Sequence, residues 1–495
     1  MKRPLERTPW EKCVAWVEAC GGEVSGVAVS SDGVRGVVVN AEKGLAKDQV
    51  VLKIPLACCV LHEDVERHAV GRAAREIADH LAARETGAEL AASVDDVALA
   101  FFLAADASDE SSPRAPYYAT LPSADDLPDV PRTWSDAELD ALLGGSPLRK
   151  RIDKGALRRD YDAVARCDVD RAWPTFDAYA WAATIVATRS FSLAEGVDAL
   201  APLADMLNHS RDRETRYGVD GDFAVWTATR PLAAGAEVHD TYGAKGNAQL
   251  LSQFGFAMVA NFEPDGSSND LRPLALPAAR DGRAAKPVDL RIGAKADVLR
   301  PFAACLDAMR AASSAAPPPV DDEFSEGDDD FLDKEEEDDD DDFPDDDDDD
   351  DDEEERALWA RRLPLEVDAL SSLAALVAAE LRGYALGDPV AALRGAPPPP
   401  PPGADAARWP ARAAASAALI LNETATLRLY ERVAARCLEV LQAPTEHAAA
   451  VVAKLRADPA AAAAADAGDD VAAVARAPRR APAAPAALGY LQRRA

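Results

Sequence analysis

The beginning of the chain changes from a helical to a strand-like pattern of apolar positions. Residues 10–19 place apolar side chains on one face of a short helix, and two glycines end it. Three β-branched runs follow, with glycine-containing turns between them. The runs are Val27-Ala28-Val29, Val37-Val38-Val39 and Val50-Val51-Leu52. We interpret them as a small β-meander.

Helical spacing then dominates from residue 64 to residue 190. The predicted helices of this stretch cover residues 72–83, 97–105 and 176–189. A further helix begins after Ser135, because Ser135 and Glu138 form a capping box, and Gly144-Gly145 end it. We therefore expect a long helical insert between two strand-rich stretches.

Strand-like segments return at residues 223–227 and 237–242, and a short helix is predicted over 247–254. Later helices are predicted over residues 295–312, 365–384 and 422–441. The last of these carries a core stripe made of Leu427, Tyr430, Ala434, Cys437, Leu438 and Leu441. The pattern thus predicts a mixed β and helical body followed by an all-helical region.

Three low-complexity segments interrupt this order. Residues 321–355 contain 27 acidic residues and one lysine, so we expect a disordered acidic insert. Residues 397–402 are a polyproline stretch, which is typical of a stiff spacer. The tail, residues 459–495, is rich in Ala, Pro and Arg, and we expect it to be disordered.

The net charge of −33 comes almost entirely from the acidic insert, because the rest of the chain carries only −7. A basic surface for nucleic acid is therefore absent from the body of the protein. The seven cysteines form no C-x-x-C pair, which argues against a structural zinc site and favours buried free thiols. We expect neither a secretory signal nor a membrane helix.

The most informative motif is the segment Asp205-Met206-Leu207-Asn208-His209-Ser210. Tyr242-Gly243 follows 33 residues after His209, and Asn247-x-x-Leu250-Leu251-x-x-Phe254-Gly255-Phe256 comes behind it. An isolated Asn-His pair is most often a surface feature, and a tyrosine at a strand end is most often a core or edge residue. Order, spacing and flanking residues together favour a functional site.

These motifs resemble the SET-domain methyltransferases, in the class of the Rubisco large-subunit lysine methyltransferase. The resemblance extends over about residues 8–460, and further matches are Gly235-Ala236-Glu237 and Thr188-Arg189-Ser190-Phe191. It implies an α+β protein with a SET-domain β-fold over residues 21–265, preceded by an N-terminal helix within residues 1–20 and interrupted by a helical insert at about 64–190. An all-α substrate-binding domain would follow over residues 266–458.

The resemblance also implies a cofactor, S-adenosyl-L-methionine, and no metal. Tyr242 corresponds to the tyrosine at the methyl-transfer site and would be the catalytic residue. The implied cofactor-binding residues are Gly33, Arg35, Gly36, Arg189, Asp205, Asn208, His209, Tyr242 and Phe256. Phe191, Leu203 and Ala204 would contact the acceptor, with carbonyls near Leu203 and Ala204 orienting the amine.

Each of these residues also has a structural interpretation. Arg189 would bind the cofactor or a nearby carboxylate, or form an ion pair to the meander. Asn208 would otherwise stabilise a turn. One ring nitrogen of His209 is expected to bond a backbone carbonyl, and His209 is not assigned as a general base. Phe191 would otherwise belong to the core, and Phe256 is expected to form a pocket wall.

The acceptor is predicted to be a lysine of a protein substrate. Lysine-directed members of the class carry an aromatic residue at the position of Phe191, whereas the actin-histidine enzyme carries a polar amide there. That enzyme also has a bulkier residue where this chain has Ala204. A histidine acceptor is the first alternative. An inactive SET scaffold that binds basic proteins through the acidic insert is the second. We expect a monomer in the cytosol or nucleus, with the plastid also open, and no nucleic-acid or membrane partner.

Overall fold

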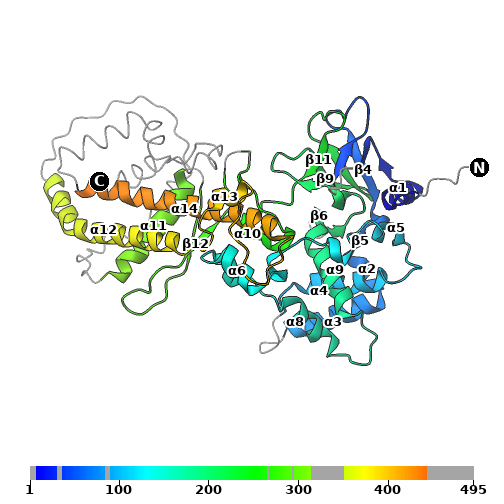
Figure 1. Cartoon of the computed structure of the whole chain (residues 1–495), viewed down its shortest axis with the longest axis horizontal. Helices are drawn as coiled ribbons and strands as arrows, with labels where there is room; N and C mark the ends of the chain where they lie inside the picture. The colour runs from blue at the N-terminus through cyan, green and yellow to red at the C-terminus, as the bar shows by residue number, and fades with distance from the viewer. Residues whose placement is uncertain are drawn as a thin grey trace, which may run out of the picture. The chain divides into compact units, whose positions relative to one another are not determined.

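A computed structural model describes residues 7–30, 36–83, 90–194, 197–264, 267–292, 295–313 and 351–442. Its contacts divide the chain into two compact units, each assembled from separate stretches of sequence. The first unit contains the chain up to Thr133 together with Ile152–Ala244 and Ser252–Gly255. The second contains Trp134–Arg151, Lys245–Leu251 and the chain from Phe256 onward. Figure 1 shows the elements of both units.

The described residues of the first unit form three small sheets of short strands. One sheet has the order β1-β4-β10-β9 and consists of Glu23–Val24, Val50–Pro55, Phe223–Ala228 and Thr215–Asp220. A second has the order β2-β3-β11-β8 and consists of Val27–Val29, Val37–Val39, Glu237–Asp240 and Asn208–His209. The third has the order β5-β7-β6 and consists of Val60–Leu61, Val197–Leu200 and Ser190–Ala194. Sheets this short depend on burial against neighbouring elements for their stability.

The predicted β-meander is wrong in its third strand. β2 and β3 pair as an antiparallel hairpin, whereas β4 pairs with β1 and β10 in another sheet. The connection between β3 and β4 is bound to the segment that follows β10, because Leu45 and Leu232 exchange backbone hydrogen bonds of 2.9 and 3.0 Å. Gly44 makes this approach possible, since a Cβ atom there would lie 2.2 Å from the Leu232 carbonyl oxygen.

The helices of the first unit follow the local sequence signals closely. Their bounds are Pro9–Ala19 (α1), His62–Arg67 (α2), Ala69–Ala82 (α3), Val94–Asp106 (α4), Ala115–Tyr118 (α5), Ala156–Ala165 (α8) and Phe176–Arg189 (α9). Thr8 caps α1 through a capping box with Glu11, and Thr175 caps α9. Helices α3 and α9 both pack against α4, whose Phe101 and Phe102 are buried. The helices and the buried strands share one hydrophobic core.

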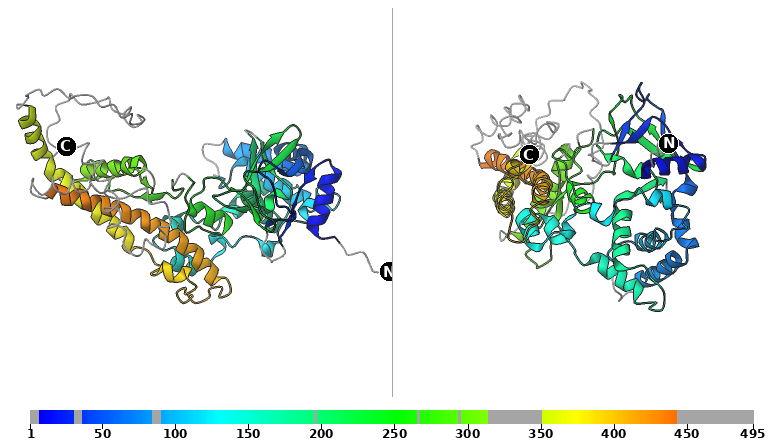
Figure 2. Two further views of the ribbon diagram at one scale, coloured as in Figure 1. Left: turned by 90° about the horizontal axis from the view of Figure 1, so that it is seen from above. Right: turned by 45° about the vertical axis from the view of Figure 1, so that its right-hand side comes forward.

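The second unit is mainly helical, as its sequence pattern predicts. It contains Asp136–Leu143 (α6), Pro147–Arg151 (α7), Asn247–Gln249 (α10), Lys295–Ala312 (α11), Asp351–Arg382 (α12), Pro389–Leu393 (α13) and Trp409–Gln442 (α14). A hairpin of β12 (Arg272–Leu274) and β13 (Val288–Leu290) adds its only described strands. The long helices α12 and α14 lie side by side, yellow and orange in Figures 1 and 2.

The apolar stripe predicted on the last helix is confirmed. Leu427, Tyr430, Ala434 and Cys437 are buried in the core of the second unit, and Leu438 and Leu441 pack against it. Helix α14 is longer than expected, because it already begins at Trp409. Helix α12 begins at Asp351, inside the acidic segment, where carboxylates favour the N-terminal end of a helix. Residues 321–350 and 459–495, for which we predicted disorder, lie outside the described residues.

The cysteines are present as free thiols. Five of them, Cys13, Cys58, Cys59, Cys305 and Cys437, are buried, and Cys20 and Cys167 are exposed. Burial raises the pKa of the Cys13 thiol to about 12, which makes it a poor nucleophile. Among the helices that the structure describes, none combines the length and the apolar character that crossing a membrane requires.

Candidate functional site

A short parallel strand pair brings the two sequence motifs together. β8 pairs with β11 so that Asn208 lies opposite His239, and His209 lies opposite Asp240. The chain leaves β11 and reaches Tyr242 two residues later. Residues separated by more than thirty positions in the sequence therefore meet at one edge of the β2-β3-β11-β8 sheet.

Tyr242 is held as a neutral phenol by its surroundings. Its hydroxyl donates a hydrogen bond of 3.2 Å to the backbone carbonyl of Leu207. Its ring lies between His209, at 5.1 Å between ring centroids, and Phe254, at 4.7 Å. Burial raises the pKa of Tyr242 to about 12, and the nearby Arg189 guanidinium offsets only part of that effect. The hydroxyl oxygen keeps lone pairs that can accept hydrogen bonds.

His209 acts as an acceptor rather than as a donor to a carbonyl, so our expectation for this ring was wrong. The backbone N–H of Tyr242 donates to His209 Nδ1 at 3.0 Å. Because Nδ1 is the acceptor, the neutral imidazole carries its proton on Nε2. His209 thus fixes the backbone of Tyr242 and stacks on its ring. The sequence motif correctly predicted the proximity of these residues but not the bond.

Arg189 binds the turn that precedes Asn208. One of its terminal nitrogens, Nη1, donates to the backbone oxygen of Asp205 at 2.5 Å and to Asp205 Oδ2 at 3.2 Å. The Asp205 side chain is fully buried, and the Tyr117 hydroxyl also donates to its Oδ2, at 3.4 Å. Arg189 therefore anchors a nearby carboxylate, which was one of our two interpretations, and the described residues of the β2–β3 hairpin form no ion pair with it.

The same turn contains a strained residue. Leu203 has a φ of 66°, in the left-handed region that non-glycine residues rarely adopt. Leu203 and Ala204 are fully buried, and the short helical turn Ala204–Met206 starts immediately afterwards. Such strain persists only where surrounding structure enforces it, and it gathers at functional sites. The sequence gives no local signal for this conformation.

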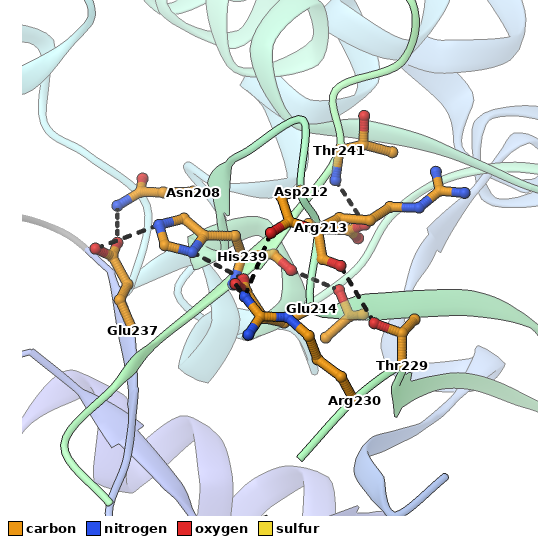
Figure 3. Close-up of polar contacts among 11 residues, drawn as sticks. Asn208, Asp212, Arg213, Glu214, Thr229, Arg230, Glu237, His239 and Thr241 are labelled. Atoms are coloured by element: carbon orange, nitrogen blue, oxygen red, sulfur yellow. Dashed lines mark hydrogen bonds and ion pairs between the residues drawn. The ribbon is translucent and has the colours of Figure 1, made fainter. Parts of the chain in front are cut away.

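A chain of polar side chains runs behind Asn208, as Figure 3 shows. Asn208 Nδ2 donates to Glu237 Oε1 at 2.7 Å, and Glu237 Oε2 lies 3.4 Å from His239 Nε2. On the other side of the imidazole, His239 Nδ1 lies 2.9 Å from Glu214 Oε2. Arg230 Nη2 donates to the second oxygen of Glu214 at 2.5 Å. The sequence motifs predict no role for His239 or Glu214, and they include Glu237 only as part of a turn.

Gly36 packs against the first hydrogen bond of this chain. A Cβ atom at position 36 would lie 2.8 Å from Glu237 Oε1 and 3.0 Å from Asn208 Nδ2. A side chain at position 36 would therefore have to displace the Glu237 or Asn208 side chain, so Gly36 lies directly against this hydrogen bond. The neighbouring candidates Gly33 and Arg35 lie outside the described residues.

The remaining candidates fall in different environments. Phe191 lies edge-on to Tyr217 and to Trp226, with both centroid distances 5.4 Å. Phe191 is half-buried, so it belongs to an aromatic cluster but is not fully enclosed in the core. Phe256 is half-buried and belongs to the second compact unit. Its role as a pocket wall stays a prediction.

Comparison with known proteins finds both lysine and histidine N-methyltransferases among the relatives of this chain. No protein-family model matches the chain. The N-lysine methyltransferase setd6 of Xenopus tropicalis is 28% identical over 182 residues, which is 32% of this chain and 40% of that protein. The actin-histidine N-methyltransferase of Danio rerio is 24% identical over 269 residues, which is 51% of this chain and 43% of that protein. The chain thus spans less than half of the length of either relative.

Solved structures resemble a larger part of the chain. The SET domain of LSMT, solved with lysine and AdoHcy, has a TM-score of 0.56 at 17% identity and covers 88% of this chain and 92% of its own. Rubisco LSMT bound to AdoMet has the same TM-score at 18% identity, and covers 88% of this chain and 94% of its own. At such identities the likeness shows the fold. The predicted α+β SET-domain fold is therefore confirmed.

Proposed function

We propose that this chain, which has the SET-domain fold of the Rubisco LSMT class, is an S-adenosylmethionine-dependent protein-lysine N-methyltransferase. The observation that carries the proposal is the β8–β11 register, which sets Asn208-His209 beside Tyr242. Each of the three residues matches a family motif, and Tyr242 presents a neutral hydroxyl at the centre of the group. The lysine methyltransferases among the sequence relatives support the same activity.

The residues of the site fit a sulfonium methyl donor. Asn208, His209 and the backbone at Gly36 are the groups that would hold it. Arg189 Nε is buried and has no hydrogen-bond partner among the described residues, which suits a site that is completed by a polar ligand. When bound, the donor supplies an activated methyl group. Cofactor-bound forms of LSMT support this assignment.

The protein's own part in the reaction is alignment more than acid–base chemistry. An amine that enters a narrow, largely apolar site loses hydration, which lowers its pKa and favours the neutral, nucleophilic form. The Tyr242 hydroxyl donates to Leu207, so its oxygen can accept a hydrogen bond from the amine and orient it. His209 Nδ1 already accepts from the Tyr242 backbone, so it is not the atom that takes the released proton.

Phe191 and Ala204 favour lysine over histidine as the acceptor. The half-buried Phe191 offers no hydrogen-bonding group that would orient an imidazole, and it packs on Trp226. Ala204 is small, where the histidine-directed enzyme carries a bulkier residue. The actin-histidine relative keeps the histidine alternative open for the test.

The test incubates the purified protein with methyl-labelled S-adenosylmethionine and a cell lysate, beside a Tyr242→Phe variant. We expect labelled lysine that falls by at least about 100-fold in the variant, because aligned groups in such sites contribute several kcal/mol to catalysis. Mass spectrometry identifies the labelled residue. Binding of S-adenosylhomocysteine to both proteins, measured by calorimetry, serves as the control for an intact site.

Three results would change the proposal. Label on histidine would replace lysine as the acceptor. Label that persists in Tyr242→Phe would remove Tyr242 from the catalytic role. If neither label nor S-adenosylhomocysteine binding is found, the inactive scaffold becomes the better interpretation. A basic partner at the acidic segment stays a prediction, because residues 321–350 lie outside the described structure.

A further inference from the structure

Glu237 controls which end of the Asn208 amide faces the rest of the site. Asn208 Nδ2 donates to Glu237 Oε1 at 2.7 Å, so the carbonyl oxygen of the amide is directed away from that carboxylate. An asparagine in this orientation offers an acceptor to its other neighbours. A ligand that meets Asn208 would therefore present a donor, such as an ammonium group.

His239 holds Glu237 in place from the opposite side. Its Nε2 lies 3.4 Å from Glu237 Oε2, and its Nδ1 lies 2.9 Å from Glu214 Oε2. Both ring nitrogens of His239 thus lie beside a carboxylate oxygen, which places the ring between Glu237 and Glu214. The His239 side chain is 26% exposed and that of Glu214 only 8%, so the contact between these two is largely shielded from water.

Glu214 fixes the histidine in turn. Its Oε2 accepts both from the His239 backbone N–H at 3.0 Å and from the ring, while its Oε1 accepts from Arg230. The Glu214 side chain is only 8% exposed, whereas that of Arg230 is 50% exposed. The buried Glu214 therefore accepts three of these hydrogen bonds, and the chain of contacts ends at the half-exposed Arg230. Figure 3 shows these residues in line.

The contacts join β11, the residue before β9 and the segment after β10 to Asn208 in β8. A side chain held by this many directional contacts loses little entropy when a ligand binds.

We propose that Glu237, held by His239 and Glu214, is a positioning residue that orients the Asn208 amide toward the methyl donor. This inference rests on the proposed function and assigns a role to residues beyond the family motifs. Glu237 acts through Asn208 and is not itself a catalytic residue.

The first test measures S-adenosylhomocysteine affinity by calorimetry in Glu237→Ala and His239→Ala. Loss of a hydrogen bond to a charged acceptor predicts about 10- to 100-fold weaker binding for Glu237→Ala. His239→Ala should weaken binding less, by about 3- to 10-fold, because Glu237 can still reach Asn208. In turnover assays, the KM for S-adenosylmethionine should rise in Glu237→Ala, with kcat at saturation changed less than about twofold.

The second unit provides a matched control. There, Asn269 Nδ2 donates to Glu263 Oε1 at 2.6 Å, the same chemistry as the Asn208–Glu237 pair. Glu263→Ala should therefore leave S-adenosylhomocysteine affinity at the wild-type value. Thermal unfolding of all variants identifies any that fail to fold.

A swap of the pair tests the direction of the amide. Asn208→Asp alone sets two carboxylates against each other and should abolish detectable binding. In the double variant Asn208→Asp with Glu237→Gln, the glutamine amide donates to the carboxylate introduced at position 208. The second oxygen of that carboxylate then replaces the amide oxygen as the acceptor. Binding should recover to within about tenfold of the wild type.

The outcomes separate this inference from the proposed function. If the wild type fails to bind S-adenosylhomocysteine, the proposed function itself is wrong. If the wild type binds but Glu237→Ala binds equally well, the positioning role is wrong. A double variant no better than Asn208→Asp overturns the direction assigned to the amide. Unchanged affinity in His239→Ala restricts the role to Glu237.

Discussion

Glu237 and Glu423 show how differently the two compact units use a carboxylate. Glu237 keeps 39% of its side chain exposed and divides its oxygens between Asn208 and His239, beside the proposed catalytic tyrosine. Glu423 is buried, and its oxygens accept from Ser146 Oγ at 2.9 Å and from the Tyr384 hydroxyl at 3.0 Å.

The neighbours of Glu423 extend this contrast. Arg272 Nε donates to the Tyr384 hydroxyl at 2.9 Å, and Arg272 Nη2 donates to Glu380 at 2.6 Å. Segments from four regions of the sequence are thereby joined inside the second unit. A second buried pair, Glu138 with Arg412 at 2.7 Å, joins α6 to α14. The polar groups of the helical unit hold elements together, whereas those of the SET-domain unit orient side chains around a site.

The largest effect is expected when the Glu138–Arg412 pair is broken. Arg412→Ala should lower the free energy of unfolding by about 3–5 kcal/mol, because it leaves the buried Glu138 carboxylate without its charged partner. Arg412 also lies over the Trp134 ring, 5.4 Å from its centroid to the guanidinium carbon. Denaturant unfolding measures the change.

Arg408→Ala is the matched control for Arg412→Ala. Arg408 pairs with Asp405 at 3.6 Å on the surface, where both side chains are nearly half exposed. Its loss should cost less than about 1 kcal/mol. Equal effects of the two variants would mean that the buried pair does not hold α6 to α14.

The second expected effect is a pH dependence of the helical unit. Burial raises the pKa of Glu423 to about 7, above its ordinary value, with Arg272 opposing the rise. The stabilisation by the neutral carboxyl is complete below the ordinary pKa of an exposed glutamate and is lost as the pH rises through about 7. Wild-type stability should therefore fall by about 2–3 kcal/mol between about pH 5 and pH 8 relative to Glu423→Gln.

Thermal unfolding of the wild type and of Glu423→Gln across this pH range checks the prediction. Glutamine keeps the shape and an acceptor oxygen but has no charge to form. Parallel pH profiles for the two proteins would show that Glu423 is ionised throughout this pH range, and would contradict the prediction.

The smallest effect is expected at the site, from Gly36→Ala. The added Cβ would press on the Asn208–Glu237 hydrogen bond, so S-adenosylhomocysteine affinity should fall by about 3- to 10-fold with little loss of stability. Gly218→Ala is the control, because a Cβ there meets nothing within 4 Å. Equal affinities in the two variants would show that the pair tolerates displacement.

Much of this protein follows from short stretches of its sequence. The periodicity and caps predicted α9 over Phe176–Arg189 and α11 over Lys295–Ala312 with the bounds observed. The order and spacing of Asn208, His209 and Tyr242 predicted that these residues lie together, which the structure confirms. The residues that make up a helix signal or a linear motif are close together in the sequence, so such features can be recognised without knowledge of the fold.

Only the tertiary structure decided which distant segments meet. In the folded chain, β4 lies in a different sheet from β3. Residues 134–151, which the sequence placed in the helical insert, belong to the helical unit. The tertiary structure also places Glu214 beside His239, 25 positions away in the sequence, and holds Leu203 in a left-handed conformation. These outcomes depend on burial and on pairing between strands far apart in the chain. A local pattern specifies which residues seek burial or a partner, but not which partner the folded chain supplies.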